Sequence, residues 1–249
     1  MAKSNEVTSD ASTIRNILTL RYDPTQNTSL PILSSHDYDP IETVSVEYIE
    51  KSMQEYVQNK IDKSKIKKIA VALSGGIDST LILALLRKKF PDIDVETISI
   101  KFAQSLDESE KAAKTSEFFG VKHQTIQLEN YLKELPQAIF AVGLPFWDLH
   151  WYYVVKAARN ISKTLVSGDG GDELFGGYVF RYTKFLSKVS KTSSPITRAK
   201  AYLNCHERDW VPDQEQLFGK NLRFSWDKIY RLLRPYFENK LPLLSQVFL

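Results

Sequence analysis

Two short stretches of this sequence combine glycines with hydroxyl and carboxylate side chains, the residue types that hold phosphate and metal ions. They are VALSGGIDS, residues 71–79, and SGDGGDELFGGY, residues 167–178. In the first, paired glycines permit backbone conformations closed to other residues, so successive amide N–H groups can converge on an anion. The helix that follows adds partial positive charge at its N-terminus. The stretch predicts a phosphate-binding turn, although an ordinary Gly-Gly turn with Asp78 or Ser79 as helix cap has the same residues.

The second stretch crowds carboxylates among glycines. Asp169, Asp172 and Glu173 repel one another unless a cation or a protonation change relieves them. A magnesium ion shared with Asp78 would relieve them, since this ion prefers hard oxygen ligands together with nucleotide phosphates. For Asp169 the alternative is an aspartate that hydrogen-bonds its own loop. The first stretch is no Walker A sequence, because no lysine follows its glycines.

Apolar segments around both stretches predict the elements that position them. Strands are expected at 68–73, 95–102, 121–128 and 163–166, and helices at 42–61, 80–90, 106–119 and 130–142. Ser105 and Glu108 form a capping-box pattern for the third helix, and Gly120 closes it. We therefore predict an α/β fold, a doubly wound parallel sheet of about five strands with a helical C-terminal extension. Ligands of such sheets lie beyond the carboxyl ends of the strands, where the first glycine turn lies.

The chain divides by composition into three parts. Residues 1–40 are polar and carry three prolines, which predicts a tail followed by an extended segment. Residues 41–190 hold the predicted sheet. Residues 191–249 are predicted to form a helical C-terminal extension, with helical patterns at 196–207 and 224–237.

Composition excludes several classes of protein. A net charge of +3 gives no reason to expect nucleic acid as a partner. No apolar run reaches membrane-spanning length and the N-terminus is polar, so we expect neither membrane nor secretion. The single cysteine, Cys205, cannot form an intramolecular disulfide and lacks the setting of a nucleophile. We expect a cytoplasmic protein and leave a homo-oligomer open.

Together the two stretches resemble a known family. SGGIDS resembles the PP-loop of ATP pyrophosphatases, and its combination with SGDGGDELFGGY resembles the synthetase domain of glutamine-dependent asparagine synthetases. This resemblance implies the fold of the adenine nucleotide alpha hydrolases and an ATP-dependent carbon-nitrogen ligase. Its reaction joins aspartate and ammonia into asparagine through a β-aspartyl-AMP intermediate, with ATP and Mg²⁺.

The resemblance also implies which residues act. Asp78 and Asp172 match the magnesium pair, and Asp169 matches a carboxylate tied to acyl-adenylate formation and to proton transfer from ammonia. Asp169, Asp78 and Asp172 are thus the expected catalytic residues. The expected ATP contacts are Leu73, Ser74, Gly75, Gly76, Asp78, Ser79, Ile100, Ser167 and Gly168.

Further residues carry both a functional and a structural interpretation. Glu108 and Glu110 match a family segment near the nucleotide, yet carboxylates at a helix start need no further explanation. Asp148 and His150 match the acyl-substrate side, or belong to a half-buried aromatic cluster. His123 lies inside a strand and is interpreted as a satisfied structural histidine, and Lys101 faces either ATP or solvent.

Two features of the family are not found. No N-terminal nucleophilic cysteine of a glutaminase domain is present, since Ala2 follows Met1. No KxDRxSM-like run with a pyrophosphate-binding lysine occurs before Leu249. We therefore expect free ammonia or a glutaminase on another chain as the nitrogen source, and a fragment or one subunit of a split enzyme. A different acyl substrate and a nucleotide-binding subunit without turnover stay open as alternatives.

Overall fold

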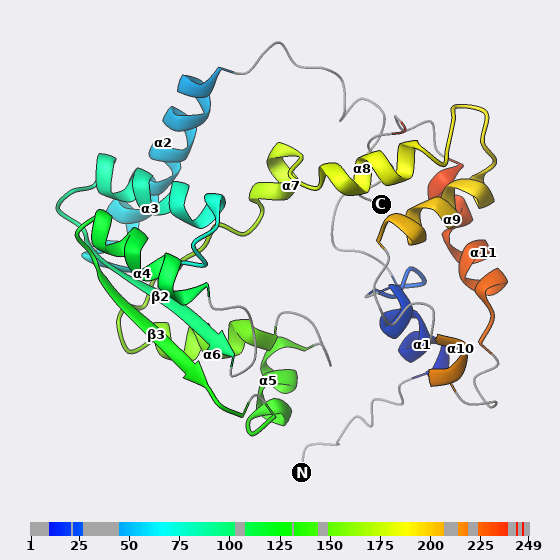
Figure 1. Ribbon diagram of the computed structural model, residues 1–249, viewed down its shortest axis with the longest axis horizontal. Coiled ribbons are helices and arrows are strands. Elements are labelled where there is room, and N and C mark those ends of the chain that lie inside the picture. Colours follow the sequence, from blue (N-terminus) through cyan, green and yellow to red (C-terminus); the bar gives the residue numbers. More distant parts are fainter. Residues whose placement is uncertain are drawn as a thin grey trace. The chain divides into compact units, whose positions relative to one another are not determined.

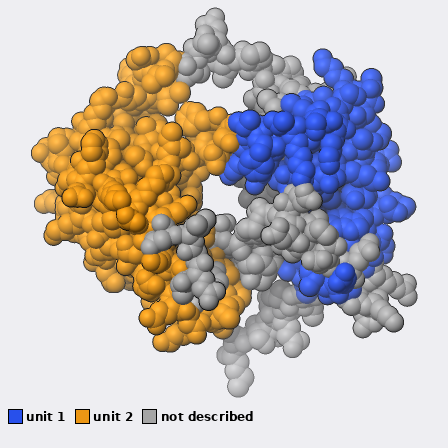
Figure 2. All heavy atoms as spheres, in the orientation of Figure 1, with its two compact units in different colours: residues 1–41, 178–249 blue, residues 42–177 orange. Residues whose placement is uncertain are grey.

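The chain forms two compact units, residues 42–177 and residues 1–41 with 178–249 (Figure 2). The computed structural model describes residues 10–20, 22–26, 45–102, 108–130, 132–143, 149–206, 214–218, 224–238, 243 and 246. Within these ranges no helix is both long and apolar enough to span a bilayer. The predicted division into 1–40, 41–190 and 191–249 stays a prediction about domains.

A parallel sheet forms the centre of the unit 42–177 (Figure 1). Its strands are β1 (Lys68–Ala72), β2 (Asp94–Phe102), β3 (Lys122–Leu128) and β4 (Leu165–Val166). The order is β3-β2-β1-β4, so β1 pairs with β2 on one side and with β4 on the other. The four strands located from apolar patterns are confirmed, whereas a fifth is not found among the described residues. The carboxyl ends of β1 and β4 lead directly into the two glycine stretches.

Helices cover both faces of the sheet, as a doubly wound fold requires. Successive residues of a strand face opposite sides. Ile69 and Val71 accordingly pack with α3 (Ile77–Lys89), α2 (Val46–Ser64) and α4 (Ser109–Phe118), whereas Ala70 packs on the opposite face with α6 (Leu149–Ala158). The short helices α5 (Leu135–Val142) and α7 (Gly171–Phe175) complete this unit.

Local capping moves several helix boundaries from their predicted places. α2 begins after Ser45, whose hydroxyl accepts from the Tyr48 amide, rather than at residue 42. On this helix Val57 and Ile61 pack against the core, whereas Tyr56 is 65% exposed. α4 begins at residue 109 and the predicted cap, Ser105, lies outside the described residues.

Glycine and proline mark two other helix ends. The predicted end of α4 at Gly120 is confirmed, because this residue adopts a left-handed φ of 63° directly after the helix. α5 starts at residue 135 rather than 130, with Pro136 in its first turn, where the missing amide proton has no helical partner to lose.

The unit of residues 1–41 and 178–249 is helical. It contains α1 (Ala11–Leu20), α8 (Val179–Leu186), α9 (Pro195–Cys205), α10 (Gln214–Leu217) and α11 (Trp226–Phe237). Residues 11–20 form a helix where we expected a tail, and Leu20 enters the core of this unit. Cys205 is buried in the same core, and this burial raises the pKa of its thiol to about 11. The thiol is therefore protonated near neutral pH, which fits a structural cysteine.

The burial pattern of α3 yields a stability prediction. Leu83 is fully buried beneath the sheet, whereas Leu81 on the same helix is 50% exposed. Leu83→Ala should lower the free energy of unfolding by about 2–5 kcal/mol, because it removes buried methyl groups and leaves a cavity. Leu81→Ala, the matched control, should cost less than about 1 kcal/mol. Urea unfolding followed by tryptophan fluorescence measures both, and equal losses would show that α3 does not pack on the sheet through Leu83.

Candidate functional site

The first glycine stretch forms a tight turn between β1 and α3. The Leu73 amide donates to the Ile98 carbonyl at 2.8 Å, which continues the β1–β2 pairing one residue past β1. The chain then turns at Gly75, whose φ of 74° lies in the left-handed region that favours glycine. Gly76 is the N-cap of α3, and since glycine has no side chain, the first amides of the helix receive no side-chain cap from this residue. The alternative interpretation, with Asp78 or Ser79 as cap, is therefore not what the structure has.

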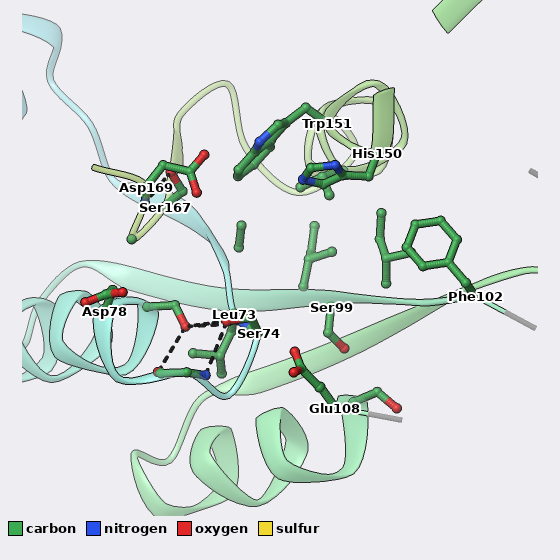
Figure 3. A pocket seen from close by; sticks show the side chains of 18 residues that line it. Leu73, Ser74, Asp78, Ser99, Phe102, Glu108, His150, Trp151, Ser167 and Asp169 are labelled. Carbon is green, nitrogen blue, oxygen red and sulfur yellow. Dashed lines mark hydrogen bonds between the residues drawn. The ribbon is translucent and has the colours of Figure 1, made fainter. Parts of the chain in front are cut away.

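Two serine hydroxyls brace this turn from inside. The Ser74 amide donates to Ser79 Oγ at 3.3 Å, and the two hydroxyl oxygens lie 3.2 Å apart. The Gly76 amide donates to Ser74 Oγ at 3.2 Å (Figure 3). The start of α3 is thereby fixed with its first amides uncapped, which is the arrangement that attracts an anion.

The second glycine stretch packs directly against the first. A Cβ on Gly168 would lie 2.5 Å from the Ser79 amide nitrogen and 2.7 Å from the Asp78 carbonyl carbon. A Cβ on Gly171 would lie 2.7 Å from the Asp78 carboxyl carbon. Neither glycine has a left-handed φ. Glycine is therefore required at these positions because a Cβ has no space, and not because of backbone conformation. β4 pairs with β1, which brings the two stretches together at the same edge of the sheet.

A cavity of about 270 Å³ opens beside this contact (Figure 3). Its walls come from the ends of β1 and β2, the starts of α3 and α4, α6, and the loop after β4. In Figure 3, Trp151 and His150 of α6 lie across the cavity from Ser99 and Glu108. The cavity thus has an aromatic wall and a polar wall.

The cavity gathers most of the residues that the sequence predicted as nucleotide contacts. Eight of them line it: Leu73, Ser74, Gly76, Asp78, Ser79, Ile100, Ser167 and Gly168. Gly75 does not line it, and a Cβ there would meet Lys111 Cβ and Cγ at 3.2 Å. That these residues bind a nucleotide stays a prediction.

The predicted catalytic carboxylates are divided between the cavity and its margin. Asp78 and Asp169 line the cavity, and Glu108 lines it as well. Asp172 does not, and its carboxylate lies so close to Gly177 that a Cβ there would overlap it. Among the described residues, no three His, Cys, Asp or Glu side chains are grouped to hold a metal ion by themselves.

The remaining candidates have varied positions. His150 lines the cavity, whereas Asp148 lies outside the described residues. Glu110 does not line the cavity and pairs with Lys114 at 2.7 Å. Lys101 does not line the cavity either.

His123 is a satisfied histidine, as interpreted from the sequence. Thr97 Oγ1 lies 2.8 Å from its Nδ1, and Ser99 Oγ lies 3.1 Å from its Nε2. Burial lowers the pKa of His123 below its ordinary value.

Sequence reasoning missed several cavity residues, notably Trp151, Val154 and Ser99. The aromatic run 146–153 was a signal for Trp151, but it did not say which ring faces the cavity. Ser99 precedes the expected contact Ile100 in β2, and strand alternation alone places it on the opposite face. Its contribution to the cavity follows from its position near the end of the strand, where both faces border the opening.

Comparison with known proteins identifies the family of this chain. The family model "Asparagine synthase" matches residues 35–246. The chain is 30% identical over 188 residues to asparagine synthetase (glutamine-hydrolyzing) 1 of Bacillus subtilis, covering 67% of this chain and 29% of that protein. It is 26% identical over 163 residues to the human asparagine synthetase (glutamine-hydrolyzing), covering 57% and 29%. The chain therefore spans less than a third of the length of these relatives.

A solved structure is similar at a lower level. The NH3-dependent NAD synthetase from Campylobacter jejuni is 13% identical, with 78% of this chain and 96% of that chain covered and a TM-score of 0.41. The fold is defined by the parallel sheet of strand order β3-β2-β1-β4. The family match extends over most of the sequence and includes both glycine stretches, so this chain belongs to the asparagine synthase family.

Proposed function

We propose that this chain is the ATP-using part of an asparagine synthetase-type amide ligase. In the first step a carboxylate oxygen of aspartate attacks the α-phosphorus of ATP, and pyrophosphate leaves. In the second step ammonia attacks the carbonyl carbon of the β-aspartyl-AMP, and AMP leaves as asparagine forms. The observation that carries this proposal is the contact between the two glycine stretches, which line one cavity at the carboxyl edge of a parallel sheet.

The turn of residues 74–79 would hold the phosphates. Charge builds on the α-phosphate and on the leaving pyrophosphate, so preorganised donors at this position lower the barrier. The uncapped start of α3 supplies amide N–H groups and the positive end of a helix dipole. Ser74 and Ser79 hold each other in place and line the cavity, which fits hydroxyls that contact phosphate oxygens.

The donor set fits a magnesium ion that arrives with the nucleotide. Asp78 supplies a carboxylate in the cavity wall, and Gly171 packs against that carboxylate immediately before Asp172. Magnesium is ordinarily held by one or two carboxylates together with substrate phosphates. Asp78 in the cavity wall, together with Asp172, which does not itself line the cavity, would hold this ion, and the ion would neutralise charge on the departing pyrophosphate.

Asp169 would accept the proton of the incoming ammonia. It lines the cavity on the loop after β4, and the Asp169 amide donates to Ser167 Oγ at 3.4 Å. As the ammonia nitrogen bonds to the carbonyl carbon, it acquires positive charge, and a carboxylate at that place removes a proton.

The partners follow from the same reaction. Aspartate and ammonia are the small substrates, and the ammonia comes from solution or from a glutaminase on a domain or subunit. The names of the two curated relatives state glutamine hydrolysis for those proteins. We propose a cytoplasmic protein without a nucleic-acid or membrane partner.

Pyrophosphate release tests the reaction. With Mg²⁺ and ATP, release should require aspartate, and asparagine and AMP should form in equal amounts when ammonia is added. Phosphorus NMR and amino-acid analysis measure these products. Release only with another carboxylic acid would change the substrate assignment, and ATP binding without release would assign a nucleotide-binding subunit.

Asp78→Asn tests the metal assignment. The amide keeps the shape of the side chain but removes its charge, so affinity for ATP in the presence of Mg²⁺ should fall at least about tenfold. Asp92→Asn, in the exposed turn before β2, is the matched control and should leave the affinity unchanged. Isothermal titration with and without Mg²⁺ measures the difference, and equal affinities for both variants would exclude Asp78 as a ligand.

Gly168→Ala tests the contact between the two stretches. The added methyl group would meet backbone atoms of Asp78 and Ser79, which cannot move without shifting the start of α3. ATP affinity should fall at least about tenfold, a loss of about 1.4 kcal/mol, because the shift displaces the amides that would hold the phosphates. Gly120→Ala is the control, since a Cβ there has nothing within 4 Å and its left-handed φ of 63° strains only a turn outside the cavity wall. Unchanged affinity in Gly168→Ala would mean that the contact does not shape the ATP site.

A further inference from the structure

A hydroxyl-lined histidine lies behind the polar wall of the cavity. His123 of β3 is the register partner of Thr97 in β2, and Thr125 is the partner of Ser99. Thr97 Oγ1 at 2.8 Å and Ser116 Oγ at 3.3 Å lie near Nδ1 of the ring. Ser99 Oγ at 3.1 Å and Thr125 Oγ1 at 3.3 Å lie near Nε2. Each ring nitrogen therefore faces hydroxyl oxygens.

The hydroxyls near Nδ1 have other acceptors for their protons. Ser116 Oγ donates to the Ala112 carbonyl at 2.8 Å. Thr97 Oγ1 has the Lys122 carbonyl at 3.1 Å and Ser116 Oγ at 2.7 Å as acceptors. With the two hydroxyl protons directed to these acceptors, both oxygens can accept from Nδ1–H. In the neutral ring Nε2 is then unprotonated and accepts a proton from a hydroxyl.

The ring is neutral near pH 7. Burial lowers the pKa of His123, and no charged group among the described residues contributes to this shift. The side chains that bond the ring from β2, β3 and α4 are hydroxyls. These elements and the turn before α4 also carry ionisable side chains, at Asp94, Glu96, Lys101, Glu108, Glu110, Lys111, Lys114, Glu117 and Lys122.

Ser99 connects this histidine to the cavity. Its side chain is 7% exposed and it lines the cavity, whereas Thr125 does not line it. Glu108 also lines the cavity and, in Figure 3, lies across it from Trp151. If the Ser99 hydroxyl proton points to Nε2, the lone pairs of Ser99 Oγ face the cavity. A bound molecule then meets two acceptors, Ser99 Oγ and the Glu108 carboxylate.

We propose that His123 is a positioning residue that turns the Ser99 proton away from the cavity and makes Ser99 a hydrogen-bond acceptor there. The inference rests on the proposed function for the identity of the ligand. Two acceptors at this wall select a ligand part that carries donors, such as the hydroxyl or amino groups of a nucleoside. Phosphates, which carry acceptors, belong at the opposite, amide-rich end beside α3.

Protonation of the ring reverses the arrangement. Nε2 then carries a proton and donates to Ser99 Oγ, so the Ser99 proton must point elsewhere and competes with the donors of the ligand. Affinity for the nucleotide should fall as the pH drops through the pKa of His123, which lies below the ordinary 6.5.

The tautomer of the wild-type protein is the first test. Nitrogen-15 NMR at pH 7.5 should find the proton of His123 on Nδ1, with the signal assigned by its loss in His123→Asn. A proton on Nε2 would overturn the proposal, whether or not the protein binds ATP. This measurement needs no variant to retain activity.

A double-mutant cycle on ATP affinity is the second test. His123→Asn keeps a donor near the Nδ1 position but removes Nε2, and should weaken Mg²⁺-ATP binding about threefold to tenfold, the range of one hydrogen bond. In the Ser99→Ala background the same change should have no further effect. His123→Asn alone should also abolish the loss of ATP affinity at low pH. Thr115→Val of α4 is the control, because this hydroxyl donates to the Lys111 carbonyl at 2.9 Å and Thr115 does not line the cavity, so both affinity and pH dependence should be preserved.

The outcomes separate this inference from the proposed function. If His123→Asn lowers ATP affinity by the same factor in the wild-type and the Ser99→Ala backgrounds, His123 is merely structural and the inference is overturned. Urea unfolding of each variant identifies losses that come from misfolding, and the wild-type tautomer then decides. If the wild-type protein binds no ATP, the proposed function fails, while the tautomer still establishes or excludes the orientation of Ser99.

Discussion

The contact between Gly168 and the start of α3 is the constraint on which the rest of the site depends. Backbone atoms of Asp78 and Ser79 occupy the space where any other residue at 168 would place its Cβ. This contact requires β4 to lie beside β1, since only adjacent strands deliver two loops to one point of the sheet edge. It also fixes the floor of the cavity, because the uncapped amides of α3 and the loop after β4 become one surface.

From this floor the cavity acquires walls of different chemistry. Strand alternation places α3 and α4 on one face of the sheet and α6 on the other, and the opening lies between their ends. Amide donors therefore gather beside α3, acceptors beside α4, and aromatic rings on α6. Such a distribution orients an elongated molecule that is anionic at one end, because each end meets groups of opposite hydrogen-bonding character.

Much of this arrangement could be predicted from local sequence. Apolar runs located all four strands, and glycines between a strand and a helix located both loops, since each signal arises within a few residues. The structure also gathers residues as different as Leu73, Ile100 and Ser167 around one cavity. Other features depend on contacts between distant residues and could not be predicted. Gly75 turns toward Lys111 of α4, and the last residue of α1, Leu20, enters the core of the helical unit. The ring of His123 meets Ser99 only through the register of β2 and β3.

His123 shows why a structural interpretation and a functional one need not compete. Burial lowers the pKa of His123, so the folded protein favours the neutral ring. Since its pKa is lower in the folded than in the unfolded chain, the unfolded chain binds more protons between these two values, and stability falls as the pH drops below about 6.5. The same neutral ring has one donor nitrogen and one acceptor nitrogen, which the rigid ring holds at fixed positions. The hydroxyls near Nδ1 belong to the core and fix the proton on that nitrogen. Packing therefore makes Nε2 the hydrogen-bond acceptor. A core contact between β3 and α4 thereby sets the hydrogen-bonding character of an atom in the cavity wall.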